Sequence, residues 1–286
     1  MADVMSIVTD RVIAALEEGT IPWHKPWVAP DRGAYNRVSG KKYSLLNQLM
    51  LQHEGEYASY KQWTDLGGQV RKGEKAEIVV FWKWPEDNDQ GKEASSDLID
   101  EDETKKKRPV LRYYRVFHIS QVDGVEPLPK SEVKFEHDPI DVIDQVLTSY
   151  VKRENILLET GDYSEAYYSP GQDLIHLPGI WLYENSEEYY STASHEAVHS
   201  TGATGRLDRE GLKKVSFGSQ IYSKEELVAE IGSVALLSIL GIETKKSFKN
   251  SVAYLQGWLR ALKDDRRMIV IAAGQAEKAV TFILGN

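Results

Sequence analysis

Two histidines and a glutamate in one short segment have the types and spacing that metal-dependent hydrolysis requires. Residues 195–199 read His-Glu-Ala-Val-His. In a helix, side chains four residues apart lie on the same face, so the imidazoles of His195 and His199 could both reach one zinc ion. Glu196 would then act as the general base that activates a water molecule. Two histidines on an ordinary surface helix give the same pattern, so the surrounding sequence must support the metal-site interpretation.

The flanking residues predict a helix around this segment. Ser186 is a suitable N-cap residue, and Glu187 and Glu188 follow in the first turn, where carboxylates interact favourably with the helix dipole. Gly202 comes shortly after the second histidine and is a typical helix stop. The two histidines would therefore lie in the last part of one helix of ordinary length.

A hydrolytic zinc site needs a third protein ligand, and the chain has no cysteine to supply it. A second apolar helix, expected from Ser223 to Gly241, offers two carboxylates one turn apart, Glu226 and Glu230. Ser223 and Glu226 fit a capping box, which gives Glu226 a structural role at the helix start. Glu230 lies in an apolar run, where a carboxylate is costly to bury without a cation. Glu230 is therefore the preferred ligand, while Glu226 could orient a ligand histidine.

Composition limits the class of protein. The chain of 286 residues is long enough for two domains of ordinary size. The absence of cysteine excludes a disulfide framework and thiolate metal sites, and it fits a reducing compartment. The N-terminus lacks the basic and apolar regions of a signal peptide, and the most apolar stretch, residues 231–240, is too short to span a membrane. We expect a cytoplasmic protein with no membrane partner.

Charge is distributed unevenly along the chain. The net charge is −9 overall, yet nine acidic residues and a single lysine fall within residues 86–104. This segment has few apolar residues and no periodicity, which predicts a disordered insertion between two strands. Outside it, residues 1–125 carry 17 basic and 11 acidic residues. A basic surface that could bind nucleic acid is therefore expected only in the first part of the chain.

Hydrophobic periodicity predicts an α+β protein with two domains. The first, residues 1–125, is a small α+β unit, and a turn-rich linker near residue 125 leads to the second, residues 126–286. The elements expected in the first domain are helices over residues 4–16 and 44–52 and strands over residues 76–84 and 111–117. The second domain is expected to begin with a helix at Pro139, followed by strands near residues 156–158, 167–168 and 173–178 and then by the metal helix.

Aromatic and basic side chains alternate in the first domain. Proteins that bind single-stranded nucleic acid combine a basic groove with aromatic rings on which bases stack. The predicted nucleic-acid-binding residues are Trp23, Lys25, Trp27, Arg37, Lys41, Lys42, Tyr43, Trp63, Arg71, Lys72 and Lys75. In a small domain some of these aromatics belong to the core. Trp82 and Trp84 share a strand face, so they are either both core or both part of a binding surface.

Both halves of the chain resemble the ArdC family of plasmid-borne antirestriction proteins. The segments that carry the resemblance are residues 22–27, 43–47, 67–75 and 117–122, and residues 168–178, 189–202, 206–209 and 225–231. His118 stands where the family more usually has asparagine, and the acidic insertion is not a defining part of the family. The resemblance implies an N-terminal single-stranded-DNA-binding domain followed by a zincin-like metallopeptidase domain. It also implies a role in protecting DNA that enters the cell by conjugation.

Two kinds of function remain open. The chain could be a zinc peptidase that its first domain recruits to an unknown protein or peptide at single-stranded DNA. Alternatively, DNA shielding could be the whole activity, with a structural or vestigial zinc ion. For the peptidase, the strand over residues 173–177 could pair with an extended peptide, and His176, Tyr168 or Tyr222 could stabilise an oxyanion.

Overall fold

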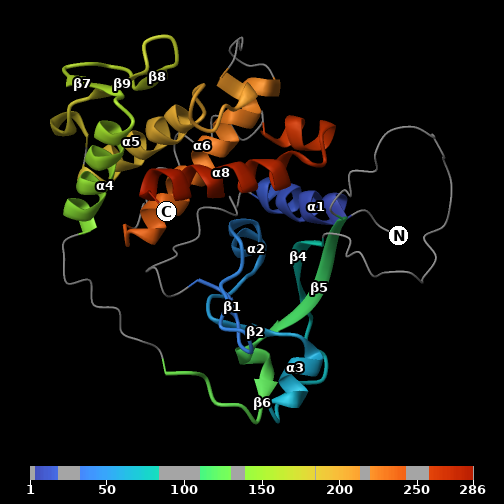
Figure 1. Ribbon diagram of the computed structural model, residues 1–286. Helices are drawn as coiled ribbons and strands as arrows, with labels where there is room; N and C mark the ends of the chain where they lie inside the picture. The colour runs from blue at the N-terminus through green and yellow to red at the C-terminus, as the bar shows by residue number, and fades with distance from the viewer. Residues whose placement is uncertain are drawn as a thin grey trace.

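The computed structural model describes residues 4–18, 33–83, 110–129, 139–183, 185–212, 220–242 and 258–285. Within these ranges helices and β-sheets are combined, which confirms the predicted α+β class (Figure 1). Several sequence predictions lie outside the described residues. These are the predictions for Trp23, Lys25, Trp27, Trp84 and the acidic segment 86–104.

The first part of the chain is built on a four-stranded sheet in the order β1-β2-β5-β4. β1 runs parallel to β2, whereas β5 is antiparallel to both of its neighbours. The strands are β1 (Tyr35–Asn36), β2 (Glu56–Ala58), β4 (Glu77–Lys83) and β5 (Val110–His118). A two-stranded sheet joins β3 (Gln69–Val70) to β6 (Val122–Asp123). The two long strands predicted around residues 76–84 and 111–117 are thus confirmed as β4 and β5.

Short helices connect these strands. The Ser59 side chain accepts a hydrogen bond from the Gln62 backbone N–H, and the Gln62 side chain reaches back to the Ser59 backbone, which starts α3. The Asn47 side chain bonds both the N–H and the C=O of Val80, which attaches α2 to β4. The helical segments here are α2 (Leu45–Met50), α3 (Tyr60–Asp65) and the 3₁₀ turn η1 (Ile119–Gln121).

The first helix, α1 (Val4–Glu17), packs against the last, α8 (Met268–Leu284), as Figure 1 shows. Its apolar stripe, which includes Val8, Val12 and Leu16, is buried as the helical spacing predicts. Exposed ion pairs link α1 to the same region, with Glu17 on Lys263 and Asp10 on Arg266. The N-terminal helix therefore contributes to the core of the C-terminal half.

The second part of the chain combines a three-stranded sheet with long helices. The sheet has the order β7-β9-β8, with β7 parallel and β8 antiparallel to β9. Its strands are β7 (Leu157–Gly161), β8 (Tyr167–Ser169) and β9 (Leu174–Pro178). The helical segments are α4 (Pro139–Arg153), η2 (Ile180–Leu182), α5 (Ser186–Thr201), η3 (Glu210–Leu212), α6 (Gln220–Ile239) and α8.

The topology corrects one expectation about this sheet. β9 contains most of the segment 173–177 that was expected to pair with a peptide, but β9 is the central strand and has a partner on each side. Its backbone groups are therefore already used in the sheet. An added strand could pair only with the edge strands β7 and β8.

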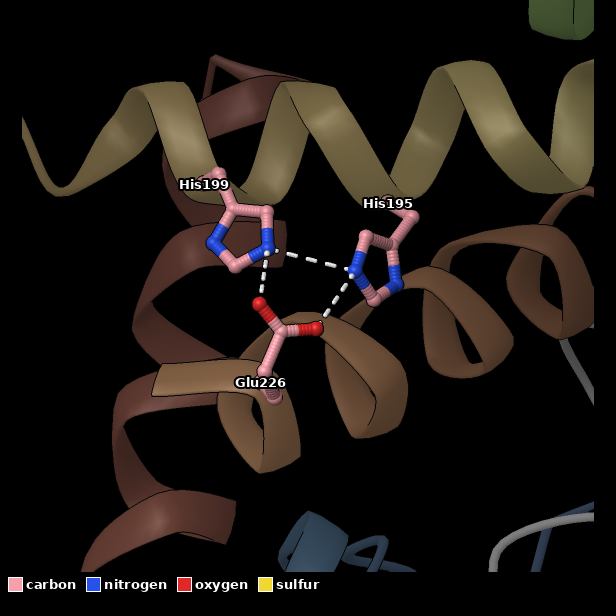
Figure 2. A group of neighbouring side chains, drawn as sticks. All are labelled: His195, His199 and Glu226. Carbon is pink, nitrogen blue, oxygen red and sulfur yellow. Dashed lines mark hydrogen bonds and ion pairs between the residues drawn. The ribbon is translucent and has the colours of Figure 1, made fainter. Parts of the chain in front are cut away.

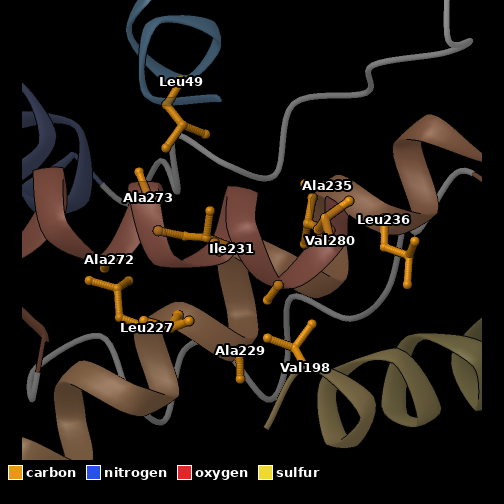
Figure 3. Close-up of a cluster of buried hydrophobic side chains, with 14 of the residues drawn as sticks. Leu49, Val198, Leu227, Ala229, Ile231, Ala235, Leu236, Ala272, Ala273 and Val280 are labelled. Carbon is orange, nitrogen blue, oxygen red and sulfur yellow. The ribbon is translucent and has the colours of Figure 1, made fainter. Parts of the chain in front are cut away.

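Helices α5, α6 and α8 pack closely around small side chains. A Cβ atom on Gly232 of α6 would lie 3.0 Å from Val198 Cγ1 of α5, so glycine allows these two helices to approach each other. Figure 3 shows Val198 beside α6 and Leu49 of α2 next to Ala273 of α8. One buried cluster thus joins residues from both halves of the chain. The division near residue 125 stays a prediction, because the core is continuous across it.

Among the described residues, no helix has both the length and the apolar character that crossing a membrane requires.

Candidate metal centre

Helix α5 holds the two histidines of the predicted site on one face. The helix begins after Asn185, whose side chain accepts a hydrogen bond from the Glu188 backbone N–H at 2.9 Å. The N-cap is therefore Asn185, one residue before the predicted Ser186. His195 and His199 lie one turn apart, and their Nε2 atoms are 3.2 Å from each other. Both rings project from α5 toward α6, as Figure 2 shows.

Glu226 of α6 lies directly opposite the two histidines. One carboxylate oxygen is 3.4 Å from His195 Nε2, and the other is 3.4 Å from His199 Nε2. The three ligand atoms lie within 4.8 Å of one another (Figure 2). Two imidazole nitrogens and one carboxylate are the protein ligands of many catalytic zinc sites. The donor set therefore fits a divalent metal ion held by His195, His199 and Glu226.

The geometry differs from the expected ligand set. The Glu230 carboxylate lies 3.7 Å from His195 Nδ1, on the edge of the ring that faces away from Nε2. Helix α6 begins at Gln220, so Ser223 and Glu226 are not at the helix start and the capping argument against Glu226 does not apply. The geometry favours Glu226 as the third ligand, with Glu230 beside His195 Nδ1. The choice between the two carboxylates stays a prediction.

A buried ion pair supports the second histidine. Glu225 lies 3.3 Å from His199 Nδ1 and accepts a hydrogen bond from Arg209 Nη2 at 2.6 Å. Arg209 also donates to the Thr201 hydroxyl and to the Val198 carbonyl, at 2.6 and 2.7 Å. A carboxylate next to Nδ1 fixes the orientation of a ligand imidazole, so Glu225 holds His199 as Glu230 holds His195.

The carboxylates determine the electrostatics of the centre. Burial lowers the pKa of His199, but hydrogen bonds to Glu225 and Glu226 outweigh this effect and raise it to about 10. Burial raises the pKa of Glu225, yet His199 and Arg209 lower it to about 2. The pKa of Glu226 also lies well below its ordinary value, because the two imidazoles outweigh burial. The buried carboxylates thus stay ionised and favour positive charge between the helices.

Glu196 lies beside the centre and is not one of its three clustered ligands. It is the neighbour of His195 on α5 and is buried. Its carboxylate interacts electrostatically with both imidazoles and with Tyr183. Tyr183, whose pKa is raised by burial and by Glu196, was not singled out by sequence reasoning. Its role as a general base stays a prediction.

The residues considered for oxyanion stabilisation are engaged elsewhere. The His176 ring lies 3.9 Å from the Tyr163 ring and 4.8 Å from the Tyr167 ring, measured between centroids. The Tyr168 hydroxyl donates a hydrogen bond to Asp173 at 2.7 Å. The side chain of Tyr222 lies outside the described residues.

Two of the predicted nucleic-acid-binding residues, Trp63 and Tyr43, belong to the interior, and a third, Arg37, is partly buried. Trp63 is fully buried, and its indole N–H donates to the Phe117 carbonyl at 2.9 Å. Tyr43 is also buried, and Arg37 forms an ion pair with the buried Glu56. A ring with no exposed face cannot stack on a base, so the prediction for Trp63 is corrected to a core role.

The other described candidates are exposed cations. Lys41, Lys42, Lys72 and Lys75 all lie on the surface. Arg71 is exposed as well, but its guanidinium contacts Glu74 at 2.9 Å and Asp123 at 3.3 Å. The lysines are therefore better placed than Arg71 to contact phosphate.

Two protein families match the chain, one in each half, in the order that the sequence analysis expects. Residues 2–117 match the N-terminal domain of the anti-restriction factor ArdC, and residues 146–275 match a zincin-like metallopeptidase family. The Mn(II)-bound crystal structure of the antirestriction ArdC protein from plasmid R388 is similar, with 34% identity and a TM-score of 0.74 over 99% of this chain and 97% of that one. Its metal-free structure gives 35% identity and a TM-score of 0.72, covering 98% of this chain and 96% of that one.

Curated relatives are similar over nearly the whole chain. The uncharacterized protein y4eC of Sinorhizobium fredii is 34% identical, covering 96% of this chain and 90% of that protein. Two DNA primases named TraC from Escherichia coli are also 34% identical over 97% of this chain. The chain spans only 26% and 20% of the length of those two primases.

Proposed function

Because the chain belongs to the ArdC family of antirestriction proteins, we propose that it binds single-stranded DNA and hydrolyses peptide bonds at a zinc centre. The DNA would be bound by the N-terminal part and the zinc ion held between α5 and α6. The observation that carries the hydrolytic half is the arrangement of His195, His199 and Glu226, with the buried Glu196 beside them. The N-terminal family match and the exposed lysines of that region support the DNA-binding half.

The chain's own residues have separate tasks in this proposal. His195, His199 and Glu226 would hold the zinc ion, while Glu225 and Glu230 keep the two imidazoles in place through their Nδ1 atoms. A zinc ion bound there supplies Lewis-acid activation for hydrolysis. Glu196 accepts a proton from the attacking water and later returns it to the leaving amine.

The family gives this chemistry its biological setting. Antirestriction proteins protect incoming DNA, and a protein that coats a single strand would do so sterically. Non-specific binding of this kind depends on contacts between cations and phosphates. The exposed Lys41, Lys42, Lys72 and Lys75 supply such cations. In this proposal DNA binding brings the zinc centre close to proteins that assemble on the same strand.

Replacing Glu196 with glutamine is expected to remove hydrolysis while leaving metal and DNA binding intact. The substitution keeps the shape of a buried side chain but removes the base, which typically costs about 10²- to 10⁴-fold in rate. The assay follows release of fluorescence from labelled casein with zinc and single-stranded DNA present. Metal content and DNA affinity are measured on the same samples.

Glu187→Gln, in the first turn of the same helix, is the matched control and should behave as wild type. Hydrolysis that persists in Glu196→Gln would remove Glu196 from the mechanism. A wild-type protein that binds single-stranded DNA and zinc but cleaves nothing would favour shielding as the whole activity.

Deleting residues 87–104 is expected to leave affinity for single-stranded DNA equal or stronger. The deletion removes eight acidic residues and one lysine, so it reduces repulsion of phosphate. The measurement is anisotropy of a labelled oligonucleotide at low and moderate salt. The gain should shrink as salt increases. Markedly weaker binding would instead make this segment part of the DNA-binding surface.

A further inference from the structure

Strands β4 and β5 pair to form a two-stranded ribbon, and one part of this ribbon carries exposed aromatic side chains. Phe81 is 45% exposed and Tyr114 is 54% exposed, although large apolar rings are usually covered. Phe81 lies directly opposite Arg112, and Val79 lies directly opposite Tyr114. Residues directly opposite each other, and those two apart, share one face of a sheet. Phe81, Arg112 and Tyr114 therefore form one exposed surface, which we term the Phe81 face.

Ring contacts anchor this surface to the core. The Phe81 and Tyr114 rings meet edge to face, with centroids 5.8 Å apart and planes at 69°. On its other side Phe81 contacts the buried Tyr43 ring at 6.3 Å. Tyr43 in turn contacts the fully buried Tyr57 ring. The two exposed rings thus form the end of an aromatic row that begins in the interior, so the sheet and the core hold them in place.

The opposite face of the same ribbon has a different environment. It carries Trp82, Tyr113 and Arg115, which are exposed as well. However, Val80 and Leu111 on that face pack into the large core cluster together with residues of α1, α2 and α8. Helices therefore lie against that side of the ribbon. On the Phe81 face, Val79 and Val116 are buried in a smaller cluster to which no described helix contributes a residue.

Charge identifies the kind of ligand. Arg112 is exposed, and among the described residues no carboxylate pairs with it, in contrast to Arg37 and Arg71. Lys41 and Lys42, which directly precede Tyr43, add further exposed cations next to the aromatic row. Aromatic rings on a sheet beside unpaired cations match the bases and phosphates of a single strand.

We propose that the Phe81 face binds single-stranded DNA, with the rings of Phe81 and Tyr114 stacking on bases and Arg112 contacting phosphate. This inference rests on the proposed DNA-binding function and states which surface performs it. A duplex keeps the faces of its bases stacked on one another, so this surface selects a single strand. A second copy of the chain fits less well. Two half-exposed rings bury about 200 Å², whereas a stable dimer needs about 800 Å² per partner.

Neighbouring residues of β5 provide matched controls, because residues 112–115 read Arg-Tyr-Tyr-Arg and alternate between the two faces. In the full chain, Phe81→Ala and Tyr114→Ala should each weaken binding of a fluorescein-labelled oligothymidylate by about 5- to 150-fold, the range for loss of one stacked base. Arg112→Ala should weaken it and flatten its salt dependence. Tyr113→Ala and Arg115→Ala should leave affinity within about twofold of wild type, and Tyr114→Phe should retain binding because the ring is kept.

An abasic oligonucleotide of the same length separates stacking from charge. Wild type and Tyr114→Ala should bind it equally, since there is no base to stack, whereas Arg112→Ala should still bind it more weakly. Thermal unfolding of each variant identifies any that fails to fold. Two outcomes with a wild type that binds oligothymidylate would overturn the assignment of the Phe81 face while the DNA-binding function stands. In one, variants of both faces lose affinity equally; in the other, only the Tyr113→Ala and Arg115→Ala variants lose affinity. If wild type does not bind, both are overturned.

Discussion

Replacing Glu226 with glutamine is expected to lower zinc affinity by more than about 100-fold. Loss of a residue that only orients a ligand lowers metal affinity by about 10- to 100-fold. Glu226 places its two carboxylate oxygens 3.4 Å from His195 Nε2 and His199 Nε2. Its loss therefore removes a ligand. Glu230→Gln should stay within that smaller range, because Glu230 faces His195 Nδ1 and acts only through the orientation of the ring.

The comparison between these two variants is the test of the ligand assignment. Zinc affinity is measured by competition with a chromophoric chelator, so that weak and tight binding fall on one scale. Glu187→Gln, on the partly exposed first turn of α5, controls for a general change in charge. A greater loss in Glu230→Gln than in Glu226→Gln would return the ligand role to Glu230, as the sequence analysis expected.

Replacing Arg209 with methionine is expected to destabilise the metal-free protein by about 3–5 kcal/mol, the usual cost of removing one member of a buried ion pair. Arg209 and Glu225 are both 4% exposed, and three hydrogen bonds join their charged groups. Methionine fills much of the space but leaves the Glu225 carboxylate buried without its guanidinium. The Thr201 hydroxyl and the Val198 carbonyl each lose the hydrogen bond from Arg209 at the same time, although the Thr201 hydroxyl still donates to the Val198 carbonyl.

Urea unfolding in the presence of EDTA measures this effect without a contribution from bound metal. The control is Lys263→Met, which removes an exposed ion pair with Glu17 in which both side chains are about half exposed. An exposed pair contributes about 0–1 kcal/mol. Equal stability of the two variants would contradict a stabilising role for the Arg209–Glu225 pair.

Local patterns were sufficient to predict most of the elements that position the site. The helical spacing of Val8, Val12 and Leu16 predicts α1, and the apolar run around residues 76–84 predicts β4. Local patterns fail to predict where a helix begins when its first residue lies outside the motif. Ser223 and Glu226 have capping-box spacing, but α6 begins three residues earlier, at Gln220. A short motif does not show whether the helix has already begun.

Burial and pairing across the fold were less predictable. Trp63 and Phe81 are both aromatic residues of the N-terminal part, yet Trp63 is fully buried and Phe81 is 45% exposed. This difference depends on which elements pack on each side of the sheet, and that is set by contacts between residues far apart in the sequence. Arg209 and Glu225 were missed as a pair for the same reason. The only sequence signal was a second carboxylate next to Glu226 in an otherwise apolar helix.

The most direct test of the account measures binding of the full chain to a labelled single strand and to a duplex of the same length over a series of salt concentrations. We expect tight binding to the single strand, weaker binding to the duplex, and a steep loss of affinity with salt, because cations contact phosphates and exposed rings stack on bases. Equal binding to both forms, or no binding to either, would contradict it. The zinc centre would then need a recruiting surface other than the N-terminal part of the chain.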